Sequence, residues 1–156
     1  MGVTITAVWE KKQSSAKKKR KTDEPNEELK TERVELFSGS YMAFACLRQG
    51  VAEVLGMMDY KEWMINSTTE LLFPSIKKKK YKCHRMIKAN PAYSVFFYSS
   101  DCDGVWNTEQ AKLVLSVVDE ALEKLAEKNE HLKHSLQIMH NGLKSCVKHE
   151  GIVTIG

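Results

Sequence analysis

Two apolar stripes in the second half of the sequence constrain the fold more than any other feature. Residues three or four positions apart share one face of a helix, so each stripe predicts a helix with one buried side. The first stripe comprises Ala111, Leu115, Val118, Leu122 and Leu125, and the second comprises Leu132, Leu136, Met139, Leu143 and Cys146. Asn107 and Gln110 resemble a capping box at the start of the first helix, and Gly151 ends the second.

One more helix is predicted from Ser40, which is a favourable N-cap residue. Its apolar positions recur at helical spacing, and Gly56 is a plausible stop. These positions are Phe44, Leu47, Val51, Val54 and Leu55. A short helix is predicted over residues 60–66, and residues 67–90 are predicted to be mostly loop.

Alternating or β-branched residues predict the strands. Residues 2–10 and 33–37 form an expected hairpin, and residues 93–98 and 152–155 are the other expected strands. Because these strands lie at both ends and in the middle of the chain, with helices between them, we predict an α+β fold. It has a small, mainly antiparallel sheet packed against two long C-terminal helices and one earlier helix.

The length of 156 residues predicts a single domain over residues 1–156. With 42% hydrophobic and 28% charged residues the composition is that of a soluble globular protein. No apolar run approaches a membrane span, and the start lacks the shape of a signal peptide, so we expect a cytoplasmic protein. The four cysteines form no close pair of the kind that binds zinc, and we expect Cys46 and Cys146 to be buried and reduced.

A basic insertion interrupts the hairpin at about residues 10–31, and its composition predicts disorder. Residues 1–31 hold eight Lys or Arg and five Asp or Glu, which leaves 16 basic and 15 acidic residues elsewhere. A nearly neutral fold argues against a basic nucleic-acid-binding domain. The basic patch of the insertion comprises Lys17, Lys18, Lys19, Arg20 and Lys21.

That patch allows three interpretations. It is a solvated loop, a nuclear import signal if the host is eukaryotic, or a contact to nucleic acid or anionic lipid through charge alone. A second basic run, residues 77–80, is followed by Tyr81. An aromatic residue beside lysines is a feature of single-stranded nucleic-acid sites, although one aromatic residue alone gives little specificity.

The candidate site is the turn at residues 99–104. Asp101, Asp103 and Gly104 match the third, fifth and sixth positions of an EF-hand loop, but Ser99 and Gln110 stand at the first and last positions, where carboxylates are usual. The turn is therefore either a weak divalent-cation site with Asp101 and Asp103 as ligands, or a structural turn before a helix. We expect no other cofactor.

Several segments together resemble a family of uncharacterised bacterial and phage proteins. The family has a Met-Gly strand, a Gly-Ser-Tyr helix start containing an arginine, and a Ser-Asp-Cys-Asp/Glu-Gly turn. The matching positions are Gly39, Ser40, Tyr41, Arg48, Ser100, Asp101, Cys102, Asp103 and Gly104. This resemblance implies a fold and a bacterial or phage origin, but no activity. Two features depart from the family: the basic insertion, and Ser99 at a position where many members have His.

Two functions are compatible with these features. The first is a small non-enzymatic binding or interaction protein of bacterial or phage type, with a protein partner or, through its basic runs, nucleic acid. The alternative is a divalent-cation-dependent enzyme that acts on an anionic substrate at Asp101 and Asp103, with Arg48 or Lys residues holding the substrate. Convergence of Tyr41 and Arg48 with the two aspartates in one pocket would favour the enzyme.

Overall fold

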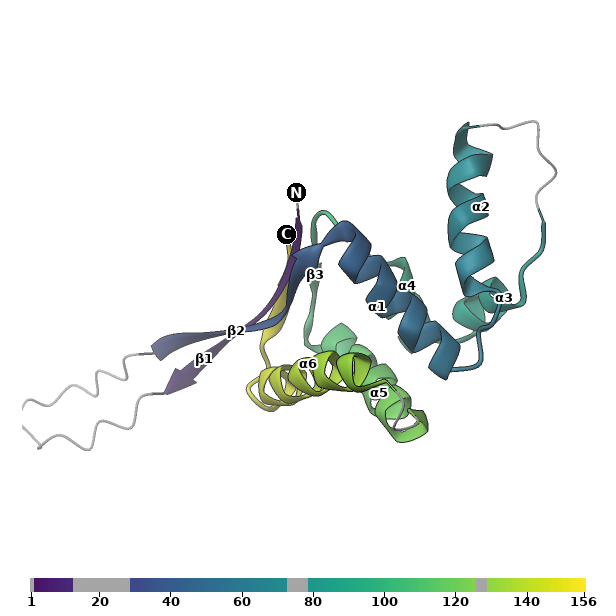
Figure 1. The fold of residues 1–156 in the computed structure, drawn as a ribbon. Helices are drawn as coiled ribbons and strands as arrows, with labels where there is room; N and C mark the ends of the chain where they lie inside the picture. The colour runs from purple at the N-terminus through teal and green to yellow at the C-terminus, as the bar shows by residue number, and fades with distance from the viewer. Residues whose placement is uncertain (1, 13–28, 73–78, 126–128) are drawn as a thin grey trace, which may run out of the picture.

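The computed structural model describes residues 2–12, 29–72, 79–125 and 129–156, which form four strands and six helices (Figure 1). In chain order these are β1 (Gly2–Lys12), β2 (Leu29–Ser40), α1 (Tyr41–Val54), α2 (Tyr60–Leu72), α3 (Lys82–Ala89), α4 (Pro91–Tyr98), β3 (Gly104–Trp106), α5 (Thr108–Lys124), α6 (Glu130–Lys148) and β4 (Ile152–Ile155). The predicted α+β class is confirmed.

The strands form one antiparallel sheet in the order β2-β1-β4-β3. The predicted hairpin is present and longer than expected, because pairing of β1 with β2 continues to Lys12 and Leu29. In Figure 1 this end of the hairpin extends beyond the other strands as a two-stranded arm. The outer parts of the predicted insertion are thus strand, whereas its basic patch, residues 17–21, falls outside the described residues.

One face of the sheet packs against α5 and α6 and forms the core. Alternate residues of β1 are buried there, as the period of a strand requires: Val3, Ile5, Ala7 and Trp9. All five residues of the predicted α6 stripe are buried. Gly142 lets α6 approach β2, because a Cβ at this position would lie 2.1 Å from Cδ2 of Leu36.

The first helix follows its prediction. Ser40 caps α1 by accepting a hydrogen bond from the N–H of Ala43 (3.1 Å), and Gly56 follows the helix with a φ of +86°. The prediction for Cys46 is wrong, because this residue is exposed, whereas Cys146 is buried as expected. The buried face of α1 is centred on Phe44, Leu47 and Val51, and Cys46 lies away from it.

The predicted strand at residues 93–98 is instead part of helix α4. Asn90 accepts hydrogen bonds from the N–H groups of Ala92 (3.0 Å) and Tyr93 (3.4 Å), and Pro91 occupies the first turn. These features favour the start of a helix at Pro91, and they outweigh the β propensity of the aromatic residues. The loop predicted for residues 67–90 is also wrong, since α2 continues to Leu72 and α3 begins at Lys82.

Candidate functional site

The predicted turn lies between helix α4 and the short strand β3, and not after a strand as predicted. Ser100 organises it, because its hydroxyl oxygen accepts from the backbone N–H groups of Cys102 (3.1 Å) and Asp103 (3.3 Å). The same hydroxyl donates to the Asp103 carboxylate at 3.2 Å. The turn is thus held by its own side chains, as serine turns commonly are.

Two predicted residues of α1, Tyr41 and Arg48, do reach this turn. The Arg48 guanidinium donates from Nη2 to the carbonyl of Ser99 (2.7 Å) and lies 4.3 Å from the ring centre of Phe44. Burial lowers its pKa, although nearby Asp101 acts in the opposite direction.

On the first turn of the same helix, Tyr41 lies close to Cys102. The thiol of Cys102, with burial and the charge of Asp101, raises the pKa of the Tyr41 phenol. The hydrogen bond from Arg48 to Ser99 thereby ties α1 to the turn.

The two ends of the EF-hand-like alignment are engaged elsewhere. The Ser99 hydroxyl accepts from the indole N–H of Trp106 (2.7 Å), and the Gln110 side chain accepts from the N–H of Asn107 (3.0 Å) in the predicted capping box. Among the described residues, no group of three or more His, Cys, Asp or Glu side chains is arranged to hold a metal ion. The turn therefore offers Asp101 and Asp103 without a surrounding ligand set.

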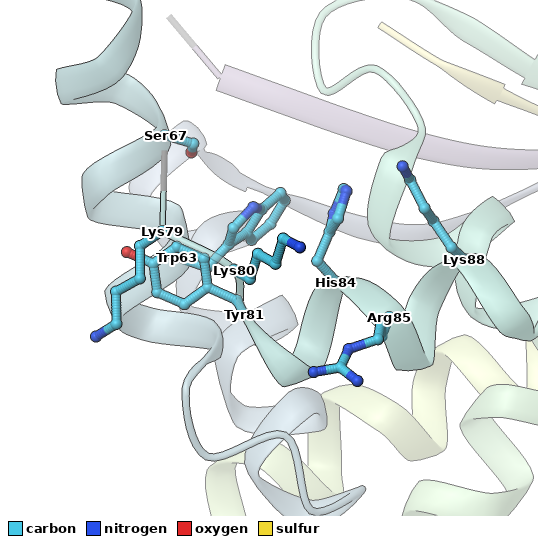
Figure 2. A pocket seen from close by; sticks show the side chains of 8 residues that line it. All are labelled: Trp63, Ser67, Lys79, Lys80, Tyr81, His84, Arg85 and Lys88. Atoms are coloured by element: carbon cyan, nitrogen blue, oxygen red, sulfur yellow. The ribbon is translucent and has the colours of Figure 1, made fainter. Parts of the chain in front are cut away.

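A cavity of about 620 Å³ lies elsewhere, at the junction of α2 and α3 (Figure 2). Its volume is within the range of small-ligand sites. It is lined by Trp63, Ser67, Lys79, Lys80, Tyr81, His84, Arg85 and Lys88. We call it the α2–α3 pocket. Figure 1 places α2 and α3 at the end of the molecule opposite the hairpin arm.

The pocket depends on how α3 is held against α2. The Asp59 carboxylate accepts from the N–H groups of Lys82 (2.7 Å) and Cys83 (3.1 Å) at the start of α3. Cys83 and Ile87, one turn apart, are fully buried. This face anchors the helix and directs its basic residues to solvent.

Tyr81 forms part of the pocket wall beside α3. It is buried, and its hydroxyl accepts from the side-chain amide of Asn66 in α2 (2.7 Å). The segment before α3 is thereby tied to α2.

Aromatic rings form the inner wall. The half-buried indole of Trp63 lies with its ring centre 5.9 Å from that of His84, at an interplanar angle of 30°. It also packs against Tyr60 (5.5 Å) and Tyr98 (6.0 Å). His84 Nδ1 is hydrogen-bonded to the Tyr98 hydroxyl at 2.5 Å, which fixes the imidazole in the wall.

Positive charge surrounds this wall. Residues 79–88 contain five Lys or Arg and no carboxylate. Lys79 pairs with Glu62 (2.5 Å), and this contact raises the pKa of the lysine. In Figure 2 the Lys79 ammonium is directed away from the pocket, Lys80 extends across it, and His84 and Lys88 extend in the same direction.

Three of the cations that line the pocket are available to a ligand. Lys80, Arg85 and Lys88 are exposed, and none forms an ion pair with a described carboxylate. The sequence indicated the basic run at residues 77–80 and Tyr81 but not a pocket, because residues 67–90 were predicted to be mostly loop. A helical spacing was present, since Cys83 and Ile87 are four apart and Arg85 and Lys88 three apart.

Comparison with protein-family models, with curated proteins and with solved structures found no match to this chain. Among the described residues, no helix has both the length and the apolar character needed to cross a membrane.

Proposed function

We propose that this protein is a non-enzymatic binding protein that takes a phosphate-bearing anion in the α2–α3 pocket. The observation that carries this proposal is the grouping of three available cations, Lys80, Arg85 and Lys88, around a cavity of about 620 Å³. The charge of the fold is nearly balanced overall, so this local excess is a specific feature of one surface and not a property of the whole chain.

The chemistry of the lining supports binding over catalysis. Guanidinium and ammonium groups are the usual partners of phosphate oxygens. The described lining contains no carboxylate and no thiol. Its histidine, His84, uses Nδ1 in a hydrogen bond to Tyr98, which suits a structural position in the wall. Charge and an aromatic surface are therefore what the pocket offers.

The divalent-cation-dependent enzyme at Asp101 and Asp103 is the second candidate. The position of Tyr41 and Arg48 against the turn favours it. Against it, Arg48 is half-buried and already donates to Ser99, and Asp103 accepts from Ser100 in its own turn. An anionic substrate would have to displace these contacts before it met the guanidinium.

The wider setting is also a proposal. Membership of the bacterial and phage family rests on a sequence resemblance at the Met-Gly start, residues 39–41, Arg48 and residues 100–104. A cytoplasmic location agrees with the pocket, because phosphate-bearing ligands are abundant there. A protein partner remains part of the first hypothesis, and no described contact bears on it.

Calorimetric titration with inorganic tripolyphosphate at low ionic strength tests the function. We expect binding by the wild type and a loss of about tenfold or more in Arg85→Gln/Lys88→Gln, since charge-assisted hydrogen bonds contribute about 1.5–3 kcal/mol each. The matched control is Lys133→Gln/Lys144→Gln, which removes two exposed lysines of α6 and should bind tripolyphosphate like the wild type. Equal losses in both variants, or no binding of tripolyphosphate or any oligonucleotide, would reject the proposed function.

A further inference from the structure

We infer that the ligand of the α2–α3 pocket is single-stranded nucleic acid, one base of which stacks on the aromatic wall formed by Trp63 and His84. This inference rests on the proposed function and gives its ligand class. A strand supplies both chemistries that the pocket presents, because each nucleotide carries a phosphate and a flat base.

The aromatic wall is the first argument. A pocket that bound phosphate alone would need only donors, yet this one places an indole at the centre of its wall. Trp63 is half-buried, and its position is held by Tyr60, His84 and Tyr98 around it. Such a fixed and partly open ring is a suitable platform for a base.

The placement of charge is the second argument. Lys80 lies on the segment before α3, and Arg85 and Lys88 lie on the exposed face of α3. A base on the wall would therefore have cations near it on two different elements, which the phosphates of one strand could contact. A free phosphate ion needs no such separation of its partners.

Duplex is disfavoured by the recessed position of the wall. The bases of a duplex are already stacked and paired, so none reaches into a cavity without unpairing. Polar groups that could read base edges are also engaged, since Asn66 donates to Tyr81 and the Ser67 hydroxyl donates to the carbonyl of Met64. We therefore expect little preference among base sequences.

Fluorescence anisotropy with labelled dT15 tests the inference, with tripolyphosphate, dTMP and the dT15·dA15 duplex as competitors. We expect dT15 to bind at least about tenfold more tightly than dTMP or the duplex. Trp63→Leu should weaken dT15 binding about fivefold to a hundredfold, and it should weaken tripolyphosphate binding far less. Trp63→Phe, which keeps a ring, should restore much of the dT15 affinity.

Tripolyphosphate provides the control for folding, because a Trp63→Leu protein that still binds it has an intact pocket. If Trp63→Leu unfolds, tryptophan fluorescence provides the same evidence. We then expect dT15 to quench the fluorescence of the wild type but not that of the folded Trp63→Phe protein. Unchanged dT15 affinity in Trp63→Leu, or equal affinity for duplex or dTMP, would overturn the inference and leave phosphate binding standing. A failure to bind tripolyphosphate and dT15 alike would overturn both.

Discussion

The carboxylate of Asp59 accepts a 2.7 Å hydrogen bond from the backbone N–H of Lys82, 23 residues further along the chain. The residue before α2 therefore caps the start of α3, together with a second bond from the N–H of Cys83. Carboxylates suit this position because the first N–H groups of a helix have no partner within it. One side chain thus sets how the two walls of the α2–α3 pocket meet.

Asp59→Ala should lower the free energy of unfolding by about 0.5–2 kcal/mol, the usual cost of a lost cap. It should also weaken tripolyphosphate binding, because α3 is no longer held against α2. Asp59→Asn keeps an acceptor oxygen and is the matched control, with a smaller loss at neutral pH. Urea denaturation followed by circular dichroism measures both, and an Asp59→Ala protein as stable as the wild type would contradict the assigned cap.

The same pair of variants reports on pH. Burial alone would raise the pKa of Asp59, but the N–H groups of Lys82 and Cys83 bind the charged form and lower it overall. A lowered native pKa stabilises the fold above the unfolded value of about 3.9. That contribution is lost as the pH falls through the native pKa. Denaturation between about pH 2 and 6 should show a steeper acid loss in the wild type than in Asp59→Asn.

Arg48 should tolerate Met better than Lys. The side chain is half-buried, its guanidinium donates to the Ser99 carbonyl and lies on the Phe44 ring, and its Nε atom is buried without a hydrogen-bond partner among the described residues. Arg48→Met removes the desolvated charge and should cost about 1–3 kcal/mol. Arg48→Lys keeps the charge without the planar group and should cost at least as much. A lysine variant with wild-type stability in urea would disprove this account of the contact.

The turn at residues 99–104 should respond to Ser100 more than to metal. Ser100→Ala loses the bonds to Cys102 and Asp103 and should cost about 0.5–1.5 kcal/mol. Calcium or magnesium at about 1 mM should leave the melting temperature unchanged, whereas a site with a Kd of about 10 μM would add about 2.7 kcal/mol. Thermal denaturation with and without the ions measures this. A stabilisation by calcium that Asp101→Asn abolishes would instead establish the cation site.

Thiol labelling should separate the four cysteines into two pairs. Cys46 and Cys102 are exposed, whereas Cys83 and Cys146 are buried. Burial, aided by Asp59, raises the pKa of Cys83 to about 12, and burial raises that of Cys146, so neither forms a reactive thiolate at neutral pH. Two thiols should react rapidly with Ellman's reagent, two only after unfolding, and none rapidly in Cys46→Ser/Cys102→Ser. Rapid loss of a third thiol would count against the packing of α3 or α6.

The sequence predicts well those elements whose pattern of residues is local and extends over several turns of helix. The α6 stripe spans four turns and has one buried face, and the capping box at Asn107 is present as expected. The strand prediction for residues 93–98 was wrong because a short run rich in aromatic and β-branched residues suits a buried helix as well as a strand. The cap at Asn90 and Pro91 decided between them, and it lies just before the segment that carried the strand signal.

The α2–α3 pocket could not be predicted from local pattern. Trp63 lies on one helix, Lys80 on a connecting segment and Arg85 on another helix, and only packing brings them together. The contact between α1 and the turn also depends on packing, since Arg48 and Ser99 are 51 residues apart in the sequence. The sequence did associate Tyr41, Arg48 and the turn, but it did so through a resemblance and not through any physical pattern.

The place of β4 in the sheet has a consequence for how the chain reaches its fold during synthesis. Residues 152–155 lie between β1 and β3, so the sheet has a gap until these residues have left the ribosome. The β1–β2 hairpin and the helices can form earlier, but the edge of β1 that pairs with β4 has no partner during that interval. The nascent chain therefore exposes an unpaired strand edge at residues 5–8 of β1, which lie inside the sheet of the native protein.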